Sequence, residues 1–163
     1  MPFPVEDLVS LHDAALERWT PPSEVPDPGG LPATLPGLFE EGHFANFAIW
    51  HLEDVARLRT VGDAAVAAAK RAIDAWNQRR NDLMEAVDLL VLEFFSEVDV
   101  TGAPLHSETA GMMIDRLSIL ALKMRNMRRV AEAASAERDG LLAEECLRRH
   151  VRSPFVILGR DSF

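Results

Sequence analysis

A stripe of polar side chains follows the long helical segment between residues 62 and 98, at steps of three or four positions. At about 100° per residue, this spacing places the side chains one above another on a single helix face. The stripe consists of Lys70, Asp74, Asn77, Asn81, Glu85 and Asp88. Asparagine is unfavourable inside helices, because its side-chain amide competes for backbone hydrogen bonds. Asn77 and Asn81 therefore indicate that this face does more than form a helix.

A second polar group lies in the preceding segment, in the sequence His51-Leu-Glu53-Asp54. His51 falls within an apolar stripe, and a histidine in such a stripe is commonly a core residue with a satisfied hydrogen bond. The neighbouring Glu53 and Asp54 support an alternative, because a carboxylate can orient an imidazole or share a metal ion with it. Both roles stay open for His51.

Three charged residues, Asp115, Arg116 and Lys123, lie in a segment that is apolar on most of its faces. Buried charges are costly unless they are paired or bound to a metal. A network of buried ion pairs that fixes helix register would account for these three residues. It explains the acids and amides of the two preceding segments less well, because these would repel each other or stay unsatisfied without a cation or a donor.

The elements that carry these residues are helices. Apolar residues recur with helical periodicity in five segments, and no alternating strand pattern is present. The predicted helices span residues 5–19, 37–59, 63–97, 107–135 and 137–151. We therefore predict an all-α fold, a helical bundle of about five helices with one very long central helix, in a single domain of residues 1–163.

Two segments are predicted to lack helix. Residues 20–36 contain six prolines and two glycines, which is typical of a loop, either a lid or binding loop or a connector across the end of the bundle. Residues 153–163 are apolar with Pro154 as their second residue, which predicts an extended C-terminal arm. Asp63 and Ser107 are the expected N-caps of the third and fourth helices.

The net charge, the cysteine count and the lengths of the apolar segments argue against several functional classes. A net charge of −9 argues against nucleic acid as the main partner. The single cysteine, Cys146, excludes an intrachain disulfide and a multi-cysteine zinc site. The first residues show no signal-peptide pattern, and no apolar segment is long enough to span a membrane. We expect a cytoplasmic protein with no membrane partner.

Apolar residues near the end of the longest predicted helix and near the C-terminus predict association between copies of the chain. Phe94 and Phe95, near the end of the longest helix, and the apolar residues 155–158 have few evident partners within one chain. We therefore expect a homo-oligomer, with a dimer as the simplest form.

Three blocks of the sequence, NFAIWHLEDVAR, KRAIDAWNQRRNDLMEAVD and SETAGMMIDRLSILALKM, resemble the signature blocks of the bacterial domain of unknown function 4254 family. The likeness covers about residues 43–127, with the three blocks in the same order. It implies an all-α fold, and the family has no assigned activity. It focuses attention on His51, Glu53, Asp54, Asp74, Asn77, Asn81, Asp82, Glu85, Asp115, Arg116 and Lys123.

A looser likeness is to the all-α nucleotide pyrophosphatases, in which acidic pairs on two helices bind magnesium that holds a pyrophosphate. Glu85-Ala-Val-Asp88 is similar to the second of these pairs. The first pair differs, because His51-Leu-Glu53-Asp54 stands where two spaced glutamates are expected.

These observations lead to three hypotheses. The first is a metal-assisted hydrolase or transferase that acts on a phosphorylated or nucleotide-linked small molecule. Its metal ligands for Mg²⁺ or Mn²⁺ would be Glu53, Asp54, Glu85 and Asp88. Its catalytic residues would be His51, Asp54 and Glu85, and its substrate-binding residues Asn77, Asn81, Arg116 and Lys123. The second is a non-catalytic helical bundle that binds a partner or stabilises an assembly, with the polar stripe as a structural network. The third is a metal-free enzyme that uses His51 and nearby carboxylates as acid and base.

Overall fold

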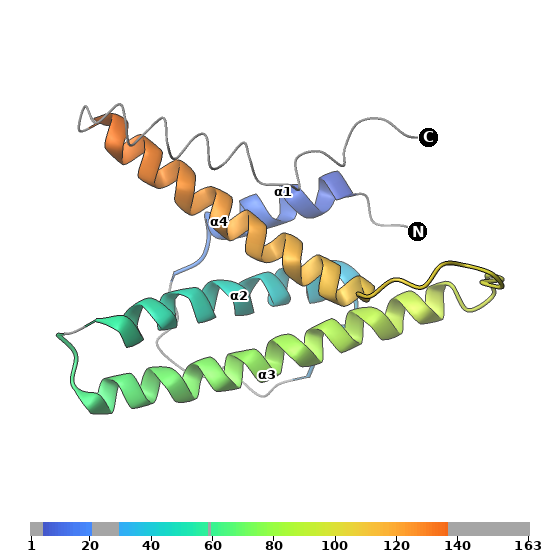
Figure 1. Cartoon of the computed structure of the whole chain (residues 1–163), viewed down its shortest axis with the longest axis horizontal. Coiled ribbons are helices and arrows are strands. Elements are labelled where there is room, and N and C mark those ends of the chain that lie inside the picture. Colours follow the sequence, from blue (N-terminus) through green and yellow to red (C-terminus); the bar gives the residue numbers. More distant parts are fainter. Residues whose placement is uncertain (1–4, 21–29, 59, 137–163) are drawn as a thin grey trace. The chain divides into compact units, whose positions relative to one another are not determined.

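The computed structural model describes residues 5–20, 30–58 and 60–136, and all regular secondary structure in these ranges is α-helical. The helices are α1 (Val5–Leu16), α2 (Leu35–Arg57), α3 (Asp63–Phe94) and α4 (Ala110–Ala136) (Figure 1). The prediction of an all-α bundle is confirmed. The count of five is not matched within the described ranges, which hold four helices. The predicted fifth helix and the C-terminal arm lie outside them.

No single helix stands apart in length. The longest, α3, has 32 residues, but α4 has 27 and α2 has 23. The prediction of one very long helix is therefore not matched. α3 ends at Phe94, three residues before its predicted end, and α4 is only five residues shorter than α3.

The start of α2 lies inside the predicted proline-rich loop. The Thr34 side chain accepts a hydrogen bond from the Gly37 N–H at 3.4 Å and caps the helix, so Pro36 falls in the first helical turn. Proline is tolerated there because the N–H groups of a first turn have no partner within the helix. Residues 20 and 30–34 of the predicted loop are non-helical, as predicted, and residues 21–29 lie outside the described ranges.

The N-caps of the next two helices also differ from the prediction. Gly62, rather than Asp63, is the N-cap of α3, and Asp63 contributes its negative charge to the first turn. Thr109, rather than Ser107, caps α4, because its hydroxyl oxygen accepts the Met112 N–H at 3.2 Å.

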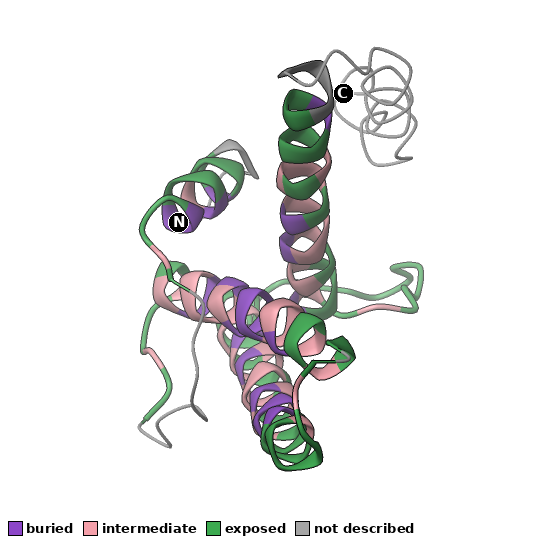
Figure 2. Ribbon diagram, turned by 90° about the vertical axis from the view of Figure 1, so that its left-hand side faces the viewer, coloured by how far each residue is buried: buried purple, intermediate pink, exposed green. Residues whose placement is uncertain are grey.

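The core lies where α2 and α3 pack side by side (Figure 2). Near one end of the pair, Ala48 and Leu52 of α2 pack with Ile73 and Trp76 of α3. At the other end, a second cluster joins all four helices. It consists of the buried residues Leu8, Leu38, Phe39, Leu83 and Val87, with Ile114 and Leu117 packed against them.

The chain divides within α4 into two parts, Met1–Ile119 and Leu120–Phe163. The packing described above belongs to the first part, and the described portion of the second part is the C-terminal half of α4. In the described ranges, no helix is long and apolar enough to cross a membrane.

Candidate functional site

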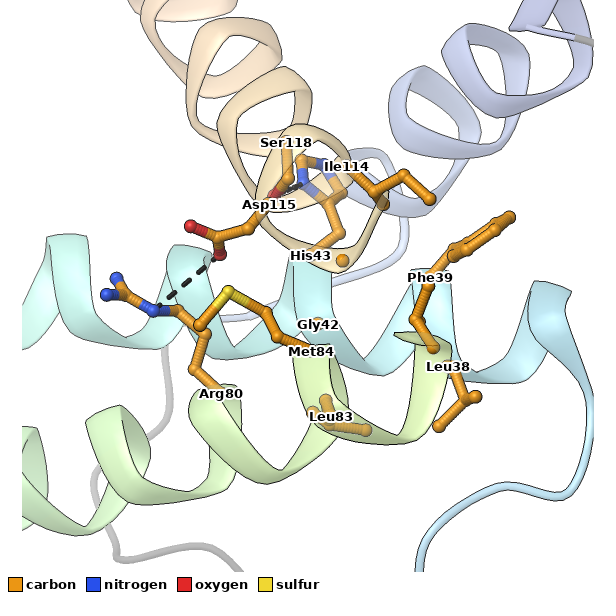
Figure 3. Close-up of a pocket in the computed structure, with 12 residues that line it drawn as sticks. Leu38, Phe39, Gly42, His43, Arg80, Leu83, Met84, Ile114, Asp115 and Ser118 are labelled. Carbon is orange, nitrogen blue, oxygen red and sulfur yellow. Dashed lines mark hydrogen bonds and ion pairs between the residues drawn. The ribbon is translucent and has the colours of Figure 1, made fainter. Parts of the chain in front are cut away.

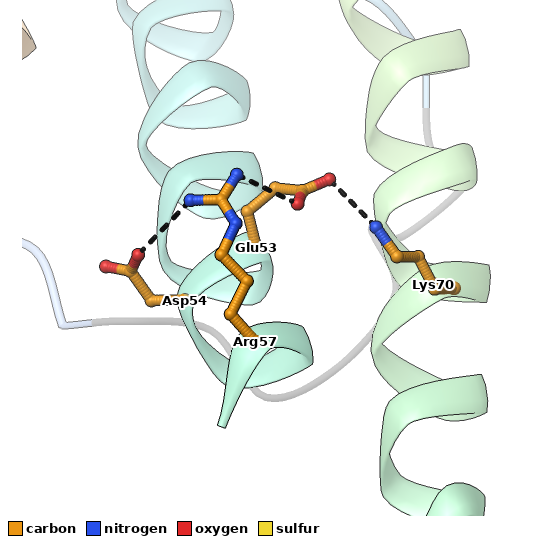
Figure 4. A network of polar contacts seen from close by, with 4 residues as sticks. All are labelled: Glu53, Asp54, Arg57 and Lys70. Atoms are coloured by element: carbon orange, nitrogen blue, oxygen red, sulfur yellow. Dashed lines mark hydrogen bonds and ion pairs between the residues drawn. The ribbon is translucent and has the colours of Figure 1, made fainter. Parts of the chain in front are cut away.

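The acidic residues of α2 predicted as metal ligands form ion pairs with basic side chains of the same chain (Figure 4). A carboxylate oxygen of Glu53 lies 3.2 Å from the Lys70 ammonium of α3, and the other oxygen lies 3.3 Å from the Arg57 guanidinium. Asp54 is exposed and lies 3.9 Å from the same guanidinium. Both carboxylates are therefore balanced without a metal ion.

The predicted residues of α3 do not gather at one place. The Asp88 carboxylate accepts the Gly111 N–H at 2.7 Å, so it holds the first turn of α4 against α3. Asn81 and Glu85 are exposed, and Asn77 is partly buried. No group of three or more His, Cys, Asp or Glu residues in the described ranges is arranged to hold a metal ion.

The remaining predicted residues lie at separate positions. His51 is partly buried on α2, with its ring centroid 4.3 Å from that of Phe47. Arg116 forms an ion pair with Glu108 and is half exposed, and Lys123 is exposed. Burial of Arg116 and Lys123, expected from the apolar character of this helix, is thus not observed, because long cationic side chains reach solvent from the helix surface.

A buried polar cluster joins α2, α3 and the first turns of α4 instead. We call it the Asn46 cluster, and it consists of His43, Asn46, Arg80, Asp115 and Ser118. The Asn46 amide nitrogen donates to an Asp115 carboxylate oxygen at 2.8 Å and to the Ser118 hydroxyl oxygen at 3.0 Å. The Asn46 amide oxygen accepts from the Arg80 guanidinium at 3.3 Å. Asn46 thereby links a residue from α3 to two residues from α4.

Two further contacts complete the cluster. Nδ1 of His43 lies 2.8 Å from the Ser118 hydroxyl oxygen, with both side chains buried. Nε of Arg80 lies 3.6 Å from the Asp115 carboxylate, so the two charges compensate each other. Of these five residues, the sequence analysis identifies only Asp115. The spacing of His43 and Asn46, and of Asp115 and Ser118, at three residues was an available signal for the others.

A second histidine, His12, stacks on His43 of the cluster. The rings of His12 on α1 and His43 on α2 stack with centroids 4.1 Å apart, and both side chains are almost fully buried. Burial lowers the pKa of His12 from 6.5 to about 4. Burial, with the neighbouring His12, lowers the pKa of His43 from 6.5 to about 3. Both imidazoles are therefore neutral at neutral pH, and each can be a hydrogen-bond donor at one nitrogen and an acceptor at the other.

A narrow cleft opens beside the cluster (Figure 3). Its lining combines apolar side chains such as Leu38, Phe39 and Met84 with the polar side chains of the cluster, except Asn46. Its volume of about 20 Å³ has room for a single water molecule. The polar groups of the cluster mainly contact one another, so the arrangement is suited to holding three helices in register.

Comparison with known proteins identifies a family. The sequence model of the family described as "Protein of unknown function (DUF4254)" matches residues 37–150. No curated protein and no solved structure matches the chain. The matched region includes α2 from its third residue, all of α3 and α4, and all five residues of the Asn46 cluster. The chain therefore belongs to the DUF4254 family.

Proposed function

We propose that this protein is a non-catalytic helical bundle that associates with further copies of itself. The observation that supports the proposal is an uncovered apolar face on the second half of α3. Leu83 is buried in the core, whereas Leu92, nine residues later and therefore about 180° around the helix, is 67% exposed. A helix that is apolar on opposite faces is normally covered on both.

Exposed apolar residues continue around the end of the helix and past it. Together they form the α3-end surface, which consists of Leu89, Leu92, Phe94, Phe95, Val98 and Val100, each at least half exposed. Phe94 lies about 160° around the helix from Leu92, so this surface wraps the end of the helix. The Phe94 and Phe95 rings contact each other edge to face, with centroids 4.9 Å apart. Aromatic residues are enriched in protein interfaces, because each buries a large area with little loss of side-chain freedom. The surface thus has the composition of an interface.

The Asn46 cluster supports the same proposal in a different way. The polar groups of the cluster mainly contact one another, and the cleft beside it has room for one water molecule, so a structural role suits it. Nε2 of His43 and Nε of Arg80 have no hydrogen-bond partner among the described residues. The second hypothesis assigns the structural role to the polar stripe of α3, of which the cluster contains no member. The metal-assisted hydrolase and the metal-free enzyme remain predictions. For the first of these, the ion pairs of Glu53 with Lys70 and Arg57 would have to open before a cation could bind.

A pair of substitutions tests the proposal. We expect wild-type protein to sediment as a dimer at low micromolar concentration, and Leu92→Ser/Phe95→Ser to sediment as a monomer. Burying each of these side chains against a partner contributes about 1 kcal/mol or more to the free energy of association. A dimer buries two copies of each, one from each protomer. Because both side chains are exposed, the variant should retain its circular dichroism spectrum.

Val9→Ser is the matched control, because Val9 is an exposed apolar residue on α1, 53% exposed, and lies outside the α3-end surface. This variant should sediment like the wild type. A wild-type protein that is monomeric at tens of micromolar would contradict the proposal. So would a Leu92→Ser/Phe95→Ser variant that associates as strongly as the wild type.

A further inference from the structure

The acidic and basic residues are strongly separated along the chain. Residues 81–115, which include the α3-end surface, contain eight acids and no lysine or arginine. The acids are Asp82, Glu85, Asp88, Glu93, Glu97, Asp99, Glu108 and Asp115. Residues 116–136 contain five lysines and arginines and one acid. The α3-end surface is therefore apolar and lies in an acidic stretch of the chain.

The end of α3 lacks the positive charge that a helix C-terminus favours. The last turn of a helix carries a partial negative charge, which cations stabilise. The last turn of α3 has no basic residue. Glu93, within that turn, and Glu97, just after the helix, are exposed without an ion-pair partner in the described ranges. Hydrogen bonds from Thr101 lower the pKa of the nearby Asp99 carboxyl, so Asp99 is ionised as well. A partner with positive charge would relieve this accumulation.

The C-terminal half of α4 has the complementary character. Lys123, Arg128 and Arg129 are exposed, and none of them has an ion-pair partner among the described residues. Val130 is 40% exposed, and Lys123, Met127 and Val130 follow each other at steps of four and three, so they share one face. This part of α4 combines positive charge with apolar side chains, as a counterpart of the α3-end surface requires.

We propose that the α3-end surface of one copy binds the basic C-terminal half of α4 from a second copy. This inference rests on the proposed function, since it names the partner of the same surface. Both members of the interface lie on the same chain, so a second copy supplies the required charge and apolar groups without another protein. The contact joins two different surfaces, and in a dimer it occurs twice, once in each direction, so the dimer is two-fold symmetric.

A charge exchange between two variants tests this contact. In Glu93→Lys/Glu97→Lys, the acidic member becomes basic, and in Lys123→Glu/Arg129→Glu, the basic member becomes acidic. Each variant alone would place like charges in contact, so we expect its dissociation constant for self-association to rise at least about tenfold. An equimolar mixture restores opposite charges at every contact between unlike variants. We therefore expect the mixture to associate as the wild type does.

Salt dependence is the second measurement. Because exposed charges are screened, raising the salt concentration from about 0.05 to about 0.5 M should weaken the wild-type association. The inference is wrong if Lys123→Glu/Arg129→Glu alone associates like the wild type, or if the mixture stays monomeric. These results would leave the proposed function intact as long as Leu92→Ser/Phe95→Ser still abolishes association. At concentrations where the wild type is also monomeric, thermal melts of both charge variants should match it, since all four positions are exposed.

Discussion

Asn46 uses both polar atoms of its side chain to join three helices. Its nitrogen donates to Asp115 and Ser118 of α4, and its oxygen accepts from Arg80 of α3. Few residues offer a donor and an acceptor at such short separation, and an amide does so without adding a charge. An asparagine at a buried position of α2 is therefore explained by its partners rather than by helix propensity.

We expect Asn46→Ala to lower the free energy of unfolding by about 1–3 kcal/mol, because it removes one donor each from Asp115 and Ser118 and an acceptor from Arg80. Urea unfolding monitored by circular dichroism measures this change. Asn81→Ala is the matched control, because Asn81 is an exposed asparagine on α3, and its replacement should change stability by no more than about 0.5 kcal/mol. Equal losses in the two variants would contradict a structural role for the cluster.

Asp115 could be identified from the sequence, whereas its partners could not. A carboxylate in a mainly apolar helix requires a partner, and this indicates Asp115 without further information. The partner could have been any donor on another helix. Asn46 and Arg80 are 69 and 35 residues away along the chain, and only the packing of α2, α3 and α4 brings them together. Asn77 and Asn81 of α3 were the more visible signal and belong to no polar cluster in the described ranges.

The close approach of α3 and α4 depends on Gly111 at the start of α4. A Cβ atom at this position would overlap the backbone carbonyl oxygen of Met84 on α3. The Gly111 N–H also donates to Asp88, so the absence of a side chain allows a direct contact between the two backbones and this carboxylate. Gly42, within α2, differs because no atom lies within 4 Å of the position its Cβ would take.

Replacing these two glycines with alanine should change the stability of the fold in opposite directions. We expect Gly111→Ala to destabilise the fold by about 1–3 kcal/mol, because the backbones of α3 and α4 must move apart. We expect Gly42→Ala to stabilise it by up to about 1 kcal/mol, since alanine favours the helix and meets open space. Thermal melts of both variants provide the comparison, and a Gly111→Ala variant as stable as the wild type would show that the close contact contributes nothing.

Helix existence was predictable because apolar periodicity is a local property of the sequence, but helix ends were not. Ser107 and Thr109 are both suitable N-caps. Thr109 is the N-cap of α4, and the first turn that follows it is held by the hydrogen bond from Gly111 to Asp88. This contact joins residues distant in the sequence, so the sequence alone does not show which cap is used. Pro36 likewise appeared to end a loop, although the Thr34 cap places it in a first helical turn.

The stability of the whole molecule should depend on pH through the buried histidines. The pKa values of His12 and His43 in the folded chain, about 4 and about 3, lie below the ordinary value of 6.5. Between these values the unfolded chain binds more protons, so the free energy of unfolding falls as the pH falls below about 6.5. Each histidine contributes up to about 1.4 kcal/mol per pH unit in this window, and neither contributes above it.

Replacing one histidine isolates this effect. We expect His12→Phe, which keeps an aromatic ring against His43, to show a weaker dependence of unfolding free energy on pH between about 4 and 6.5. The carboxylates are the same in both proteins, so the comparison isolates the contribution of the replaced histidine. Urea unfolding of the variant and the wild type at several pH values measures the difference. An unchanged pH dependence would show that His12 is not neutral in the fold.

Trp19 follows α1 and lies among three rings of α2, with centroids 5.3 Å from His43, 5.0 Å from Phe44 and 5.6 Å from Phe47. The chain has three tryptophans and no tyrosine, so tryptophan dominates its ultraviolet fluorescence. Rings held at fixed angles also produce near-ultraviolet circular dichroism, which is lost when packing becomes fluid. Separation of the N-terminal segment from α2 would therefore change the tryptophan fluorescence and the near-ultraviolet circular dichroism of the unmodified protein.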